Sequence, residues 1–242
     1  MAPAYGYNSP MLELNLVQKI AVWVLPVLFA ITVHEVAHGW MARRLGDPTA
    51  QMLGRLTLNP IKHIDPFGTV LVPLVMLLLP GGFVFGWAKP VPVTWENLRN
   101  PKRDMAVVAA AGPGANLMMG IMWALVIKLG ALLASHVDTS LIFLVYMGVA
   151  GVFINTILMV LNLVPLPPLD GGRVLVGVLP GPLAWKVSRI EPYGMIIIVV
   201  LLVSGILGQI LWPFISLVLV GLAKVGGIEP GLLIAILNQM GA

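Results

Sequence analysis

Long apolar runs separated by short polar loops make up most of the chain. Four of them are long enough for a helix to cross the roughly 30 Å hydrocarbon core of a bilayer: residues 14–40, 105–134, 141–166 and 193 to about 220. Two further apolar pieces, 64–79 and 228–240, are shorter, and proline and glycine interrupt the first of them. The pattern predicts an all-α polytopic membrane protein with about four to six transmembrane helices.

The composition agrees with a membrane environment. Hydrophobic residues make up 59% of the 242 positions and charged residues only 10%, which is too little polar surface to cover a water-soluble globule. The net charge of +4 comes from basic residues in short loops and not from a polar face, so a nucleic-acid partner is not expected. The chain has no cysteine, which excludes disulfides, thiolate metal ligands and a cysteine nucleophile.

The basic loops predict an orientation. Of the 14 Lys and Arg residues, most lie within residues 43–62, 89–103 and 173–189, and the positive-inside rule places these three loops in the cytoplasm. The connection 135–140 has no Lys or Arg and should lie outside. The first two basic loops share a side only if the chain enters and leaves the membrane by one face between them. We therefore expect a re-entrant segment or hairpin near residues 64–93, in a multi-pass protein of the cytoplasmic (inner) membrane.

Residues 81–93 combine aromatic and β-branched residues with glycine and proline. Two interpretations remain open. The segment could be a short extended edge that pairs with the backbone of an extended substrate, or an interfacial loop anchored by its aromatic side chains.

The first apolar run contains the motif HExxH at residues 34–38, towards its cytoplasmic end. Two histidines four positions apart lie on one face of a helix, so His34 and His38 can bind one cation, and Glu35 can reach a metal-bound water. Zinc lowers the pKa of such a water to roughly 7, and Glu35 would accept its proton as the water attacks a peptide carbonyl. Ionisable groups at membrane depth are expensive and indicate function.

A catalytic zinc usually has three protein ligands, so a third one is required. Asp170 fits best, because the run 141–166 enters from outside and delivers it to the same cytoplasmic-side depth as the two histidines. Three prolines and two glycines within residues 162–172 would unwind the helix there and aim the carboxylate at a metal. A turn or capping role for Asp170 is the alternative. His136 and Asp138 lie in the predicted outer loop and are set aside.

Two further polar residues, His63 and Asn116, are candidates with open roles. His63 could orient a neighbour of the site, stabilise an oxyanion or lie at the membrane interface. Asn116, beside the Gly-Pro-Gly break at 112–114, could line the active site or hydrogen-bond between helices, and the latter is the expectation for Asn155.

The HExxH at 34–38, together with the pattern NxxPxPxLDG at 162–171, resembles the site-2 protease family of intramembrane zinc metalloproteases. The runs 55–68, 85–92 and 111–116 are similar to its compact bacterial branch, without PDZ or CBS domains. The match covers about residues 28–176.

The resemblance implies a function and roles for single residues. It implies one Zn²⁺ per chain bound by His34, His38 and Asp170, with Glu35 as the catalytic glutamate. It implies that Asn162 binds the substrate backbone, and it makes Asn116 a candidate to line the site. The expected enzyme hydrolyses peptide bonds within or near transmembrane segments of membrane proteins in the lipid bilayer.

The expected organisation is a single membrane-embedded peptidase domain over residues 1–242. Its catalytic core covers about 14–176, and its C-terminal transmembrane segments cover about 193–242. The sequence indicates no oligomeric state and no particular substrate.

Two other functions compete. A polytopic metal or ion transporter would also have broken helices and buried polar groups, but it would give Glu35 no task. A catalytically silent relative that only binds membrane proteins predicts the loss of a catalytic position, whereas all four are present.

Overall fold

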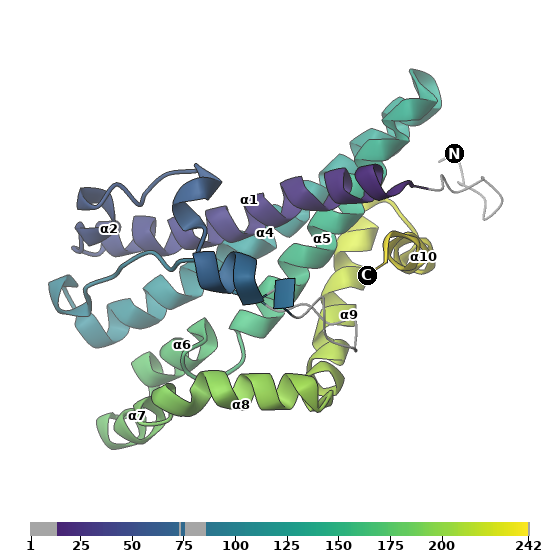
Figure 1. The fold of residues 1–242 in the computed structure, drawn as a ribbon. Helices are drawn as coiled ribbons and strands as arrows, with labels where there is room; N and C mark the ends of the chain where they lie inside the picture. Colours follow the sequence, from purple (N-terminus) through teal and green to yellow (C-terminus); the bar gives the residue numbers. More distant parts are fainter. Residues whose placement is uncertain (1–13, 73, 76–85, 242) are drawn as a thin grey trace. The chain divides into compact units, whose positions relative to one another are not determined.

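The computed structural model of the protein describes residues 14–72, 74–75 and 86–241 (Figure 1). Within these ranges the chain is helical or irregular and contains no β-strand. The α-helices are α1 (Leu16–Arg44), α2 (Thr49–Met52), α4 (Pro101–His136), α5 (Phe143–Asn162), α6 (Asp170–Val178), α7 (Gly181–Ser188), α8 (Glu191–Val203), α9 (Ile206–Gly226) and α10 (Pro230–Met240). The described residues also contain four short 3-10 or π segments: η1 (Pro60–His63), η2 (Pro66–Leu71), η3 (Trp95–Asn97) and η4 (Thr139–Ile142).

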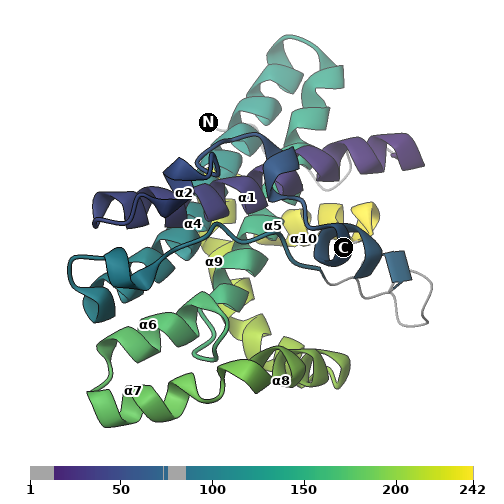
Figure 2. The same ribbon diagram turned by 60° about the vertical axis from the view of Figure 1, so that its left-hand side comes forward.

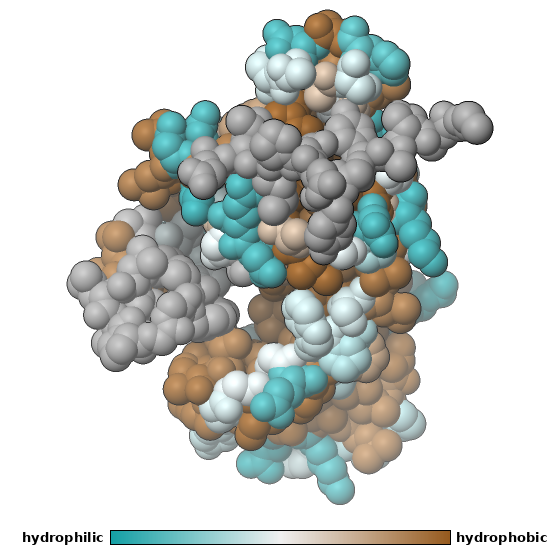
Figure 3. All heavy atoms as spheres, turned by 90° about the vertical axis from the view of Figure 1, so that its right-hand side faces the viewer, coloured by the Kyte–Doolittle hydropathy of each residue, from teal (hydrophilic) through white to brown (hydrophobic). Residues whose placement is uncertain are grey.

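Among the described residues, four stretches are long and apolar enough to cross a membrane: α1, α4, the stretch Thr139–Asn162 that contains η4 and α5, and α9. Many of their large apolar side chains are exposed, and Figure 3 shows broad hydrophobic areas on the face that it presents. Such surfaces suit lipid as the surrounding solvent. The prediction of an all-α polytopic membrane protein is confirmed.

The apolar run that begins at residue 193 differs from its expected form. We expected one helix to about residue 220, but α8 ends at Val203 and α9 begins at Ile206. Gly205 lies between them with φ of 75°, a left-handed conformation that ends a helix and that glycine adopts without steric penalty. Because α8 has 13 residues, it is too short to span the bilayer, and α9 is the spanning helix.

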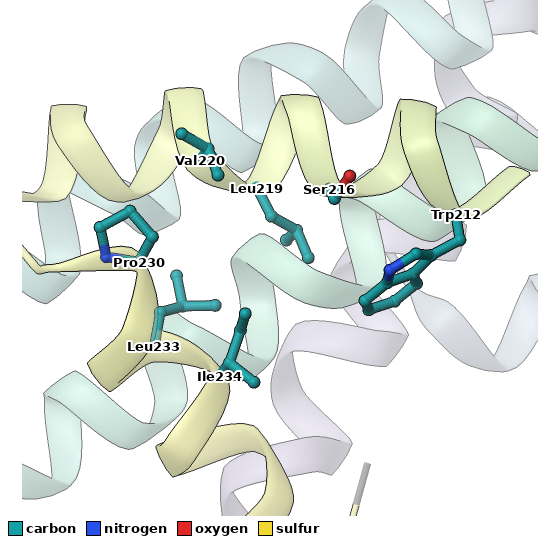
Figure 4. A pocket seen from close by; sticks show the side chains of 7 residues that line it. All are labelled: Trp212, Ser216, Leu219, Val220, Pro230, Leu233 and Ile234. Carbon is teal, nitrogen blue, oxygen red and sulfur yellow. The ribbon is translucent and has the colours of Figure 1, made fainter.

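The chain divides into two compact units, and the prediction of a single domain over 1–242 stays a prediction. The first unit comprises Met1–Val27, Leu117–Ile157 and Trp212–Ala242. In its core, Gly151 of α5 lies directly on the Trp123 ring of α4, and Trp23 meets the edge of Phe153 at 6.0 Å between ring centroids. Its helices α9 and α10 enclose a small cavity of about 30 Å³ (Figure 4). The cavity is lined by apolar side chains and one hydroxyl: Trp212, Ser216, Leu219, Val220, Pro230, Leu233 and Ile234.

The second unit comprises Leu28–Asn116 and Leu158–Leu211. Within it, α6 and α7 form a pair of adjacent short helices (Figure 2). Close packing fixes α6, since a Cβ on its Gly177 would lie 2.6 Å from the Cβ of Ala106 in α4. This unit holds the candidate metal ligands and Glu35, together with His63, Asn116 and Asn162.

The two described ends of the expected hairpin lie side by side in this unit. The Trp87 N–H donates to the Gly68 carbonyl at 3.1 Å, and the Lys89 N–H donates to the His63 carbonyl at 2.9 Å. The residues before and after the expected hairpin are therefore neighbours, as a hairpin requires. Residues 76–85 lie outside the described residues. For the segment 81–93, an extended edge and an interfacial loop were both open, and its described residues 86–93 are irregular and form no β-strand.

Candidate metal centre

The two histidines of the motif project from one face of α1. Their rings lie 4.6 Å apart between centroids and are nearly perpendicular, with 87° between their planes. The His38 Nε2 and the His34 Nε2 are 3.1 Å apart. A spacing of four residues brings the side chains together, as the helical period predicts.

Asp170 reaches these histidines because the chain turns sharply after α5. Residues 163–169 form consecutive tight turns, and α6 begins at Asp170 with its first turn pressed against them. A Cβ on Gly171 would lie 2.3 Å from the Leu163 carbonyl oxygen, and one on Gly172 would lie 2.2 Å from the Pro167 nitrogen. The glycines after Asp170 are therefore required by close backbone contact.

The three side chains converge on a common point. The Asp170 Oδ2 lies 3.2 Å from the His34 Nε2 and 3.3 Å from the His38 Nε2. All three side chains are about nine-tenths buried. Burial by itself raises the pKa of the Asp170 carboxyl. The hydrogen bonds and charges of the two histidines together outweigh burial and lower this pKa to about 2. The carboxylate is therefore ionised at neutral pH.

The hydrogen-bond partners of the two Nδ1 atoms determine which histidine tautomers are present. The Asn116 amide donates its Nδ2–H to the Ala30 carbonyl at 3.2 Å, so its Oδ1 faces the His34 Nδ1 at 2.6 Å as an acceptor. The His38 Nδ1 lies 2.8 Å from the Val108 carbonyl, which can only accept. Both histidines consequently carry their proton on Nδ1. In the neutral rings, Nε2 therefore has a free lone pair, and both Nε2 atoms face the Asp170 carboxylate.

The three atoms lie 3.1 to 3.3 Å apart, so with both rings neutral their lone pairs face one another, and a cation between them would remove the repulsion. The Asp170 Oδ2 has no hydrogen-bond partner although it is buried, which agrees with a ligand atom. Zinc bound tetrahedrally at 2.0–2.1 Å would separate its ligand atoms by about 3.3 Å, close to these distances. The donor set of two imidazoles and a carboxylate therefore fits zinc.

Helix α4 closes one side of the site at Gly112. A Cβ there would lie 2.4 Å from the His38 Nε2 and 2.6 Å from the His34 Cε1. Only glycine leaves room for the two rings. The Gly-Pro-Gly segment, interpreted from the sequence as a break, lies within the continuous helix α4 and provides this space.

Glu35 is half-buried on α1 and is not one of the three converging residues. Its Oε2 accepts a hydrogen bond from the Val91 N–H at 2.7 Å. This bond fixes one carboxylate oxygen and leaves the other free of any bond made by the described residues.

The other candidates lie in separate places. Asn116 contacts a histidine directly. The Asn162 amide donates to the Leu158 carbonyl one turn earlier in its own helix, at 2.9 Å. His63 is 2% exposed and its Nε2 donates to the Thr57 carbonyl at 2.9 Å, so it is not in the cluster. The backbone groups of Val91 and Val108 were missed, because no side-chain pattern in the sequence marks them.

Comparison with known proteins agrees with these observations. Residues 22–143 match the family described as Peptidase family M50. The chain belongs to peptidase family M50. The resemblance to the site-2 protease family and the assignment as a membrane metalloprotease are thereby confirmed.

Three relatives of this M50 protein carry names that state a metal. It is 36% identical over 199 residues to "Putative zinc metalloprotease YwhC" of Bacillus subtilis, covering 80% of this chain and 85% of the relative. It is 30% identical over 199 residues to "Putative zinc metalloprotease Rip2" of Mycolicibacterium smegmatis, covering 81% and 72%. It is 31% identical over 160 residues to the Mycobacterium tuberculosis protein of the same name, covering 66% and 56%. No solved structure matches the chain significantly.

Proposed function

We propose that this M50 protein is an intramembrane zinc metalloprotease that hydrolyses peptide bonds within or beside the transmembrane segments of other proteins. The proposal is carried by the convergence of three metal-ligand atoms from His34, His38 and Asp170 in a buried site. The names of the relatives, which specify zinc, support the choice of metal.

The chemistry divides between the metal and the chain. When zinc is bound, it supplies a Lewis acid that acidifies a water and polarises the scissile carbonyl. Glu35 accepts the proton of that water as general base and then donates it to the leaving amine. The Val91 N–H keeps one Glu35 oxygen engaged, so the other oxygen is the one that takes the proton. Asn116 and the Val108 carbonyl keep both Nε2 atoms turned towards the metal.

The site would lie in the membrane near one interface. His34 and His38 are on a helix long and apolar enough to span, and Trp40 and Arg44 follow on the same helix. The Arg44 guanidinium lies 4.4 Å from the centroid of the Trp40 ring, a pair typical of the headgroup region. By the positive-inside rule, the basic loops support a cytoplasmic position for this end, so we propose that the protein lies in the cytoplasmic membrane with its site on the cytoplasmic side.

The substrate would be a transmembrane protein segment, with lipid as the surrounding solvent. A helix keeps its peptide carbonyls hydrogen-bonded, so the segment must unwind before water can attack it. Helix-breaking residues near the cytoplasmic end of a single-span protein are therefore expected in good substrates.

The test uses the purified full-length protein in detergent, with zinc content and cleavage of a model transmembrane peptide measured together. Glu35→Gln removes the base and keeps the three ligands, so we expect full zinc content and at least about 1000-fold slower cleavage. Glu229→Gln, which changes an exposed glutamate at the start of α10, is the matched control and should cleave normally.

The outcomes separate the competing functions. Zinc retained together with cleavage by wild type and not by Glu35→Gln supports the protease. Cleavage that survives Glu35→Gln contradicts the mechanism. Zinc binding without any cleavage would favour a transporter or a silent binding protein.

A further inference from the structure

A short segment, residues 91–97, crosses the end of α1 beside the candidate site, and we call it the strap. Its first residue donates its backbone N–H to the Glu35 Oε2 at 2.7 Å. Its apolar side chains Val93 and Trp95 pack against a small cluster that includes Ala42 of α1. These two side chains do not by themselves specify where along α1 the strap's backbone lies, because apolar contacts are non-directional.

One buried carboxylate makes directional hydrogen bonds to the strap. Asp47, in the loop after α1, is fully buried. Its Oδ2 accepts from the Thr94 N–H at 2.8 Å, and its Oδ1 accepts from the Asn97 Nδ2 at 3.0 Å. The backbone N–H of Thr49 donates to it at 3.1 Å, and the Thr49 hydroxyl donates to the same oxygen. Two of these four donors belong to the strap and two to Thr49, the first residue of α2, so Asp47 joins the strap to the turn that connects α1 and α2.

The two carboxylates hold the same short piece of backbone. Asp47 binds the N–H of Thr94, and Glu35 binds the N–H of Val91, three residues earlier. With Pro92 between them, this piece has a restricted backbone, so fixing Thr94 limits where Val91 can lie. Gly39 sets the distance to α1, because a Cβ on it would lie 2.8 Å from the Val91 Cγ1.

We propose that Asp47 is a positioning residue for the peptidase reaction, holding the strap in the register at which the Val91 N–H orients the Glu35 carboxylate. The inference rests on the proposed function. Asp47 does not touch the metal ligands or a substrate, and it acts through Val91. Its effect is to keep one oxygen of the base engaged and the other directed at the water.

The kinetic test compares Asp47→Asn with wild type in the zinc-loaded full-length protein. Asparagine keeps the size and one acceptor oxygen, but it replaces the second oxygen by a donor that faces the strap's own donors. We expect kcat to fall about tenfold, with KM and bound zinc each within about twofold of wild type. Asp104→Asn is the matched control: Asp104 is also buried and accepts a backbone N–H, from Asn100 at 2.8 Å, and its replacement should leave kcat unchanged.

A double-mutant cycle distinguishes positioning from general weakening of the fold. Glu35→Asp keeps a carboxylate base but shortens it by one methylene, so it can no longer keep the bond to Val91. In that background Asp47→Asn should lower kcat by less than about twofold. Equal losses in both backgrounds, or a wild-type kcat in Asp47→Asn, would overturn the proposal.

Amide exchange tests the register independently of activity. Asp47→Asn should speed hydrogen exchange at the Val91 and Thr94 amides by about tenfold, whereas Asp104→Asn should not. Unchanged exchange at Val91 overturns the inference whether or not the protein cleaves peptides. If wild type exchanges as expected but cleaves nothing, the proposed function fails while the contact between Asp47 and the strap stands.

Discussion

Replacing Asn116 by alanine tests the arrangement that prepares the histidines for a metal. The amide oxygen accepts the His34 Nδ1–H at 2.6 Å, and the amide nitrogen donates to Ala30 at 3.2 Å. Asn116 is 1% exposed, so the truncation leaves a buried imidazole N–H without an acceptor. Such an orphaned donor costs about 1–3 kcal/mol. It also releases the tautomer that keeps the Nε2 lone pair towards the metal.

We expect Asn116→Ala to weaken zinc binding about 10- to 100-fold, the usual effect of removing a hydrogen-bond partner of a metal-bound histidine. The assay is competition for zinc between the detergent-purified protein and a chromogenic chelator. Asn116→Asp restores an acceptor with a negative charge and should bind zinc at least as tightly as wild type. Asn155→Ala is the matched control: Asn155 is buried, its amide donates to the Gly151 carbonyl at 2.9 Å, and its loss should leave zinc affinity unchanged.

One result would refute the reasoning about tautomers. If folded Asn116→Ala binds zinc as tightly as wild type, the His34 ring does not need the amide to present its Nε2. An equal loss of zinc affinity in Asn155→Ala would show a general effect of polar truncation in these helices.

Three further predictions follow from close contacts and from one buried charge. Gly112→Ala places a methyl group 2.4 Å from the His38 Nε2, so zinc content should fall at least about tenfold, measured by atomic absorption, while circular dichroism stays helical. Gly171→Ala pushes on the Leu163 carbonyl and should destabilise the fold by about 1–3 kcal/mol, seen as a lower thermal midpoint in detergent. Burial raises the pKa of Asp47, but hydrogen bonds from Thr49, Asn97 and Thr94 lower it below its usual value. The ionised Asp47 carboxylate therefore stabilises the fold fully above its unfolded pKa of about 3.9, and this stabilisation is lost as the pH falls through the lower folded pKa. The difference in thermal midpoint between wild type and Asp47→Asn should consequently shrink below about pH 4. A gap that stays constant down to pH 2 would contradict this.

The apolar pattern predicted the fold class well because the requirement it reflects is local. A helix that crosses lipid needs about 20 apolar residues in sequence, and four stretches satisfy this. The apolar pattern missed the break after α8, because hydropathy along the sequence does not register a turn of the backbone. Residues on both sides of Gly205 are apolar, so hydropathy continues through a point where the backbone turns.

The site could be predicted in part. The HExxH spacing brings two imidazoles together through helix geometry alone, and the orientation argument selected Asp170. Asn162 and His63 lie apart from the cluster, since one bonds its own helix and the other bonds the Thr57 carbonyl. The residue types alone did not predict where these two side chains lie, because any nearby backbone carbonyl can accept a hydrogen bond from an amide or an imidazole.

The sequence by itself determined that the chain is a membrane-embedded helical protein with a metal motif, because hydropathy and a four-residue period act over short distances. Only the tertiary structure decided which atoms surround that motif. The Val108 carbonyl and the Val91 N–H carry no side-chain signal, yet one selects a histidine tautomer and the other holds Glu35. Backbone groups are the same at every residue, so their partners are known only once the chain has packed.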